Sequence, residues 1–168
     1  MRLAIYAGTF DPITRGHLSV VERAARLFDR LIVVVAVNPG KIPLFSAEER
    51  EEMIREVTRQ WPNVSCARTE AYVVALARDL GARYLVRGVR GATDIESEIL
   101  LARMNQELAP EIETVFVPAH AELSEVSSSR VKQRAVQGLD VSAYCPPEIE
   151  SRLRRRLAER AQAELAHV

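Results

Sequence analysis

One unbroken run of apolar, mostly β-branched residues lies near the N-terminal end of the chain, at residues 31–37. A strand of a parallel sheet with both faces buried has this pattern, whereas a strand with one wet face alternates apolar and polar residues. Shorter apolar runs at residues 3–7, 64–67, 84–86 and 114–117 predict four further strands. We therefore expect five strands.

The segments between these runs carry apolar residues at helical spacing. Two series show it clearly: Leu18, Val21, Ala25 and Phe28, and Met53, Ile54, Val57 and Trp61. Amphipathic helices present one apolar face to a core with this period. Ser46 to Glu49 matches a capping box, and Gly81 and Gly138 stand where helices commonly end.

Alternating strands and helices predict an α/β fold, a Rossmann-like, doubly wound five-stranded parallel sheet with helices on both faces and a C-terminal helix. With 168 residues, of which 48% are hydrophobic and 27% charged, residues 1–168 are expected to form a single domain. A helical tail from about 147 to 168 carries an apolar stripe at Ile149, Leu153, Leu157 and Leu165. Ligands of such sheets bind beyond the carboxyl ends of the strands.

Charge and cysteine content exclude several classes of protein. Lys plus Arg and Asp plus Glu both number 23, so a positive site must arise from local arrangement, and nucleic acid is not an expected partner. Cys66 and Cys145 have no zinc-ligand or disulfide spacing and are interpreted as packing residues. No membrane span or signal pattern is present, so we expect a cytoplasmic protein.

The loop after the first expected strand has the composition of a phosphate site. Residues 7–17 read Ala-Gly-Thr-Phe-Asp-Pro-Ile-Thr-Arg-Gly-His, and a helix is expected to follow. Glycine lets backbone N–H groups approach an anion, Thr9 adds a hydroxyl, and the helix adds unpaired N–H groups and the positive end of its dipole. His17, with Gly16 leaving room beside it, is the first catalytic candidate.

A second motif, Val126-Ser127-Ser128-Ser129-Arg130-Val131-Lys132, combines hydroxyls and N–H groups at a helix start with a lysine. Alone it could be only an N-cap. Together with Thr14-Arg15-Gly16-His17 it resembles the nucleotidyltransferase superfamily, whose first signature is H-or-T-x-G-H. The resemblance implies that both motifs grip one nucleoside triphosphate.

Two arginines follow the fourth expected strand in the loop Arg87-Gly88-Val89-Arg90, and their guanidinium groups suit phosphate oxygens. This loop, the segments 38–41 and 45–50, Glu98 and residues 104–108 are similar to the phosphopantetheine adenylyltransferase family over most of residues 1–150. The resemblance implies transfer of the adenylyl group of ATP to 4′-phosphopantetheine by direct in-line attack. The products would be dephospho-CoA and pyrophosphate, with Mg²⁺ entering alongside ATP.

The resemblance also implies a site. Its catalytic residues are His17, Lys41 and Arg90. ATP binding falls to Thr9, Phe10, His17, Gly88, Val89, Arg90, Glu98, Leu123, Ser124, Glu125, Val126, Ser127, Ser128 and Ser129. The acceptor substrate would be bound by Thr9, Lys41, Val73 and Arg87. No metal ligand is expected from the protein. Departures from the family pattern at Ala7, Ala71, Tyr72, Ile95, Ser97 and Leu123 concern adenine stacking and the pantetheine pocket.

Family members commonly form hexamers and respond to CoA, so a homohexamer and CoA feedback are expected from the resemblance. One alternative remains a related adenylyl- or cytidylyltransferase with another acceptor, such as nicotinamide mononucleotide or glycerol phosphate. A second is a non-catalytic nucleotide sensor or nucleic-acid-binding protein, motivated by the Arg-rich tail.

Overall fold

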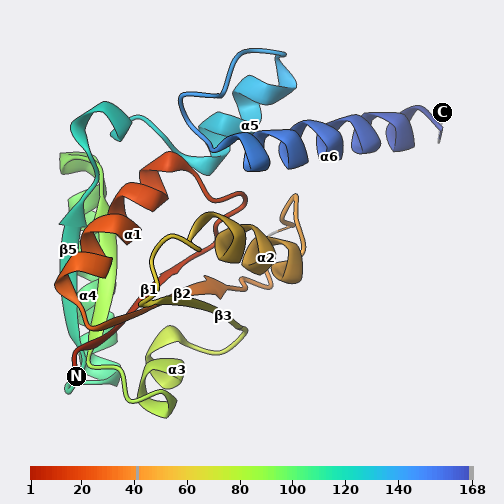
Figure 1. The fold of residues 1–168 in the computed structure, drawn as a ribbon. Helices are drawn as coiled ribbons and strands as arrows, with labels where there is room; N and C mark the ends of the chain where they lie inside the picture. Colours follow the sequence, from red (N-terminus) through yellow and green to blue (C-terminus); the bar gives the residue numbers. More distant parts are fainter. Residues whose placement is uncertain (41, 167–168) are drawn as a thin grey trace.

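The computed structural model describes residues 1–40 and 42–166 and contains the expected alternation of strands and helices (Figure 1). The elements are β1 (Leu3–Gly8), α1 (Arg15–Leu27), β2 (Arg30–Ala36), α2 (Ala47–Val57), β3 (Val64–Thr69), α3 (Val73–Asp79), β4 (Tyr84–Val89), α4 (Ala92–Leu108), β5 (Glu113–Pro118), the 3₁₀ turn η1 (Ala121–Leu123), α5 (Ser128–Val136) and α6 (Pro147–Leu165).

The five strands form one parallel sheet in the order β3-β2-β1-β4-β5. Residue Ala4 of β1 is paired with Leu31 of β2 on one side and with Tyr84 of β4 on the other. The strand predicted as buried on both faces, β2, has five successive buried residues from Leu31 to Val35. This confirms the doubly wound α/β prediction, and the strand order reverses beside β1.

Helices cover both faces of the sheet. Alternate residues of β1 and β2, such as Tyr6 and Val33, join one buried cluster with α1, α2, α5 and α6. Their neighbours, such as Ile5 and Val34, join the other cluster with α3. Both cysteines pack as expected: Cys145 lies inside the first cluster and Cys66 packs against it.

The sequence signals for helix ends are confirmed. Ser46 accepts a hydrogen bond from the backbone N–H of Glu49, and the Glu49 carboxylate accepts one from the N–H of Ser46, at 2.8 Å. Gly81 and Gly138 follow the ends of α3 and α5 with φ of 70° and 71°, a conformation that side chains with a Cβ rarely adopt.

Helix α6 runs across the layer of α1 and α2 and projects past it (Figure 1). Ile149 and Leu153 are fully buried and Leu157 packs against the same cluster. Leu165, the last residue of the apolar stripe, lies on the projecting turns and is 78% exposed. Arg156 fastens α6 to α2 through the Glu49 carboxylate and stacks on the Phe45 ring, 5.0 Å from its centroid.

Helix α4 differs from the other long helices because its described side chains are only partly buried or exposed. Ile99, Leu100, Met104 and Leu108 present apolar surface to solvent. Within residues 1–40 and 42–166, no helix combines the length and apolar character needed to cross a bilayer.

Candidate active site

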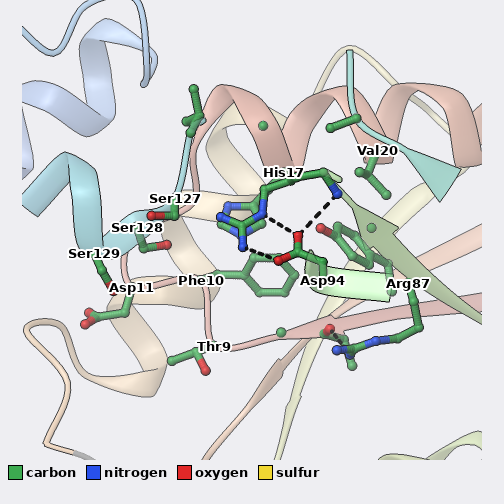
Figure 2. A pocket seen from close by; sticks show the side chains of 18 of the residues that line it. Thr9, Phe10, Asp11, His17, Val20, Arg87, Asp94, Ser127, Ser128 and Ser129 are labelled. Atoms are coloured by element: carbon green, nitrogen blue, oxygen red, sulfur yellow. Dashed lines mark hydrogen bonds and ion pairs between the residues drawn. The ribbon is translucent and has the colours of Figure 1, made fainter. Parts of the chain in front are cut away.

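A cavity of about 660 Å³ lies at the carboxyl ends of β1 and β4. This is where the strand order reverses, the usual ligand position of doubly wound sheets. Figure 2 shows side chains from the β1–α1 loop, β4, α4 and the start of α5 around it. The two motifs that the sequence singled out, at residues 7–17 and 126–132, therefore border one space.

His17 is held at the start of α1 by reciprocal hydrogen bonds with Thr14. The hydroxyl of Thr14 accepts the backbone N–H of His17, and the N–H of Thr14 donates to Nδ1 of the imidazole at 3.1 Å. Because Nδ1 accepts this bond, a neutral ring carries its hydrogen on Nε2. The ring lines the cavity, so Nε2–H is the donor it can offer a ligand there.

Burial lowers the pKa of His17 to about 4, and the positive charge of Arg90 acts in the same direction. The imidazole is therefore neutral near pH 7 and acts as a hydrogen-bond donor, not as a cation. Behind it, the Phe10 ring stands edge-on at 5.1 Å between centroids, and Tyr6 stands edge-on to Phe10 at 5.3 Å. Phe10 is 2% exposed, so its ring supports His17 from the core side.

The shifted pKa of His17 predicts a pH dependence of stability. In the unfolded chain, histidine binds a proton near pH 6.5, whereas the folded ring binds one only near pH 4. Protonation therefore favours the unfolded state as the pH falls from about 6.5 towards 4, and the free energy of unfolding should drop by about 1–3 kcal/mol from this residue. Above pH 6.5 this contribution is complete and constant.

Urea denaturation at pH 7.0 and 4.5 measures that drop. The variant His17→Asn keeps an acceptor for the Thr14 N–H but does not titrate, so its stability should change less between the two pH values. An equal change in both proteins would contradict the neutral state of His17.

Arg87 reaches the cavity from β4 with its guanidinium already paired. Nε and Nη2 contact the two oxygens of Glu98 at 2.6 and 2.8 Å, and Nη1 donates to the carbonyl of Ala7 at 3.2 Å. The sequence predicted Arg87 for the acceptor and Glu98 for ATP, without this pair. Both line the cavity, and an incoming phosphate would share the guanidinium with the carboxylate.

Arg90, three residues after Arg87 in the chain, forms a similar pair with a carboxylate of α4. Its Nε and Nη2 contact the carboxylate of Asp94 at 2.8 and 3.0 Å, and its backbone N–H contacts the same group at 3.2 Å. The Arg90 hydrogen bond lowers the pKa of Asp94 below its usual value. Asp94 thus supports the loop.

The turn Ser127–Ser129, which we call the serine turn, contacts the β1–α1 loop directly. Ser127 is the N-cap of α5 and accepts the Arg130 N–H at 3.2 Å, while the Ser128 hydroxyl donates to the Pro12 carbonyl at 2.8 Å. Gly16 lies against the Val126 carbonyl so closely that a Cβ there would stand 3.2 Å from it. The N-termini of α1 and α5 are therefore fastened to each other beside the cavity.

Gly88 allows β4 to approach α1 closely. A Cβ at this position would stand 2.9 Å from Cγ2 of Val20, which is 2% exposed, and 3.3 Å from the Tyr6 hydroxyl. Gly88→Ala should therefore lower the free energy of unfolding by about 1–3 kcal/mol, measured by urea denaturation, because the buried valine must shift.

Gly91, three residues after Gly88 in the chain, provides the matched control for it. A Cβ there meets no atom within 4 Å, and the residue is the N-cap of α4, a position that serine favours. Gly91→Ser should therefore keep the stability within about 0.5 kcal/mol of wild type. Equal losses in both variants would contradict the close approach at Gly88.

The cavity brings together most of the predicted site residues but not all. Thr9, Phe10, His17, Arg87, Gly88, Arg90, Glu98 and Val126–Ser129 line it. Outside its lining lie Val73, which packs against the α3 side of the core, Val89, Leu123, Ser124 and Glu125, which pairs with Arg130. Lys41 lies outside the described residues.

Sequence reasoning missed Asp11, which lines the cavity and is 4% exposed. An Asp-Pro pair is by itself typical of a turn. The available signal was its charge: a carboxylate in an anion-binding loop has to face protein donors, not the ligand.

Carboxylates of the cavity are all engaged by cations: Asp11 by Lys132, Asp94 by Arg90 and Glu98 by Arg87. Across the described ranges, no group of three or more His, Cys, Asp or Glu side chains is placed to hold a metal ion.

Comparison with known proteins gives one consistent family. A family model described as cytidylyltransferase-like matches residues 5–134. A phosphopantetheine adenylyltransferase from Carboxydothermus hydrogenoformans is 44% identical over 93% of this chain and 96% of its own length. The enzymes of that name from Gloeobacter violaceus and Nocardioides sp. are 47% and 46% identical, over 93% and 94% of this chain and 97% and 99% of theirs.

Two solved structures share the fold at low identity. A putative nicotinate-nucleotide adenylyltransferase from Vibrio parahaemolyticus superposes with a TM-score of 0.70 at 16% identity, covering 91% of this chain and 99% of its own. The nicotinic acid mononucleotide adenylyltransferase of Plasmodium falciparum, complexed with NaAD, gives 0.66 at 15%, covering 94% and 95%.

Proposed function

Since this chain belongs to the phosphopantetheine adenylyltransferase family, we propose that it transfers the adenylyl group of ATP to 4′-phosphopantetheine, giving dephospho-CoA and pyrophosphate. The observation that carries the proposal is the single cavity bordered by His17, by Arg87 of β4 and Arg90 directly after it, and by the turn Ser127–Ser129. A nucleotide and a second phosphate-bearing molecule both need donors, and this cavity supplies them from three directions.

The chemistry requires little proton transfer. The acceptor phosphate carries about 1.5 to 2 negative charges near neutral pH and can attack as it stands. One of its oxygens forms a bond to the α-phosphorus of ATP. The bond between that phosphorus and the departing pyrophosphate, which lies in line with the new bond, breaks. The obstacle is repulsion between anions and charge building on the transferring group, so positioning and electrostatic stabilisation are the main tasks of the enzyme.

The positions of the main polar residues around the cavity suggest their roles in this reaction. The neutral His17 donates from Nε2 to an oxygen of the transferring phosphoryl group, beside the N-terminus of α1. Lys41 joins it in that role on the family resemblance. Arg90 and the turn Ser127–Ser129 hold the β- and γ-phosphates, and Arg87 and Thr9 receive the acceptor phosphate.

The remaining assignments follow the family pattern. Phe10, Gly88, Val89, Glu98 and the segment 123–126 contact the nucleotide, and Val73 with Lys41 contacts the acceptor. Magnesium enters as part of the ATP substrate. Residues 1–168 act as one nucleotidyltransferase domain in the cytoplasm.

Assembly of copies into a homohexamer, and feedback by CoA, complete the proposal. The exposed apolar side chains of α4 supply a candidate contact surface for that assembly. Sedimentation velocity of the purified chain tests the hexamer, and an effect of added CoA on initial rates tests the feedback.

Pyrophosphate release with ATP and a panel of acceptors tests the activity. Phosphopantetheine should support turnover, while nicotinamide mononucleotide and glycerol phosphate should not, and CTP should replace ATP poorly. Turnover with another acceptor and none with phosphopantetheine would move the chain to a different reaction of the same superfamily. Tight, salt-sensitive binding of nucleic acid without pyrophosphate release would favour the binding-protein alternative.

A further inference from the structure

The buried carboxylate of Asp11 accepts hydrogen bonds from two separate parts of the chain. Its oxygens accept the backbone N–H of Leu44 at 3.0 and 3.1 Å and that of Phe45 at 2.9 Å. One of them also accepts the Lys132 ammonium group of α5 at 2.7 Å. Asp11 itself belongs to the loop between β1 and α1, residues 9–14, which we call the phosphate loop. It therefore ties that loop to the β2–α2 connection and to α5.

A second buried ion supports the same junction from the opposite side. Arg50 of α2, which is 2% exposed, donates from Nη1 to the Thr9 carbonyl at 2.8 Å and from Nε to the Ser46 carbonyl at 3.2 Å. The phosphate loop therefore acts only as a hydrogen-bond acceptor at these points. Its Asp11 carboxylate accepts the N–H groups of the β2–α2 connection, and its Thr9 carbonyl accepts the guanidinium of Arg50 in α2.

The segment held by Asp11 forms a wall of the cavity. Ile42 and Pro43, directly before Leu44, line the cavity together with Thr9. Lys41 immediately precedes Ile42 in the chain. Loss of the hydrogen bonds between Asp11 and Leu44 would free this wall of the cavity.

We propose that Asp11 is a positioning residue, which holds the 42–45 segment against the phosphate loop and, through that segment, supports the role proposed for Lys41 in the transfer. The inference rests on the proposed adenylyl transfer, because it assigns a role in that reaction. A carboxylate suits the task since it only accepts hydrogen bonds and matches two backbone N–H groups and an ammonium group at once. An amide would turn an NH₂ group towards one of these donors.

The test compares Asp11→Asn with a matched control, Asp29→Asn. Asp29 also accepts a backbone N–H and a guanidinium, both from Arg2, but at the far end of the sheet and in exposed surroundings. Asp11→Asn should lower kcat about ten- to a hundredfold, the scale for a misplaced reacting group, whereas Asp29→Asn should stay within about twofold. Hydrogen–deuterium exchange of the Leu44 and Phe45 amides should accelerate only in Asp11→Asn.

Introducing Asp11→Asn into Lys41→Ala separates positioning from mere stabilisation. If Asp11 acts through the lysine, the same change lowers kcat by less than about threefold in that background, because the group it positions is gone. An undiminished loss in that background, or a kcat within twofold of wild type despite faster exchange, overturns the proposal. If Asp11→Asn folds poorly, Asp11→Asn/Lys132→Met, which removes both charges, carries the same comparison against Lys132→Met.

Failure of the reaction itself is recognised separately. A wild-type chain that releases no pyrophosphate with ATP and phosphopantetheine overturns the proposed function together with this role. A wild-type chain that turns over normally while Asp11→Asn matches it overturns the role of Asp11 alone.

Discussion

Replacing His17 with alanine should lower the turnover number about a hundredfold or more, the scale of losing one donor that acts on the charge of a transition state. The ring offers its Nε2–H to the cavity because Nδ1 is occupied by the Thr14 N–H, and its low pKa keeps it neutral. The interaction strengthens as charge builds on the transferring group, so kcat should fall more than the KM for either substrate changes. Initial rates of pyrophosphate release measure both constants.

Two further substitutions separate catalysis by His17 from its part in the cap of α1. Asparagine places its oxygen where Nδ1 lies, so His17→Asn keeps the cap but loses the donor and should be nearly as slow as His17→Ala. Glutamine places its amide near Nε2, so His17→Gln should recover part of the rate despite a weaker cap. High activity in His17→Asn would show that the residue serves the helix and not the reaction.

Replacing Arg87 with alanine should lower kcat/KM for phosphopantetheine about a hundredfold, mainly through KM. The substitution removes a guanidinium that can bind two oxygens and leaves the half-buried Glu98 carboxylate unpaired in the cavity wall. An anionic acceptor would then meet negative charge in place of positive. The KM for ATP should change much less.

Arg78 offers a close control for Arg87, because it also combines a carboxylate partner, Glu111, with a backbone carbonyl, that of Leu108, and it lies outside the cavity lining. Arg78→Ala should leave both Michaelis constants unchanged. Adding Glu98→Ala to Arg87→Ala should restore part of the affinity by removing the unpaired charge. A rise in the KM for ATP alone would assign Arg87 to the nucleotide.

Local patterns in the sequence were sufficient for the architecture. The apolar run predicted as a strand at 31–37 became β2, which ends at Ala36. The capping box at Ser46 and the glycines at 81 and 138 mark helix ends as predicted. Each of these depends on backbone geometry within a few residues, which a local sequence can specify. The exposure of Leu165 at the far end of α6 was not specified by the local pattern, because it depends on whether the body of the protein reaches that far.

Pairing between distant residues was beyond such patterns. Arg87 and Arg90 were expected to bind phosphates, yet the first turns of α4 bring a carboxylate to each of them. The opposite holds for Asp11, whose turn-like sequence concealed a buried carboxylate with partners 33, 34 and 121 residues away.

The amino-acid sequence by itself determined the strand and helix alternation and the family, because these depend on residue type and short spacing. Only the tertiary structure decided that the motifs share one cavity, that His17 presents a neutral Nε2–H, and that Asp11 ties the cavity wall together. Those properties arise where parallel strands bring loops remote in the chain to one edge of the sheet, and where burial and neighbouring charges then set how each group is paired and protonated.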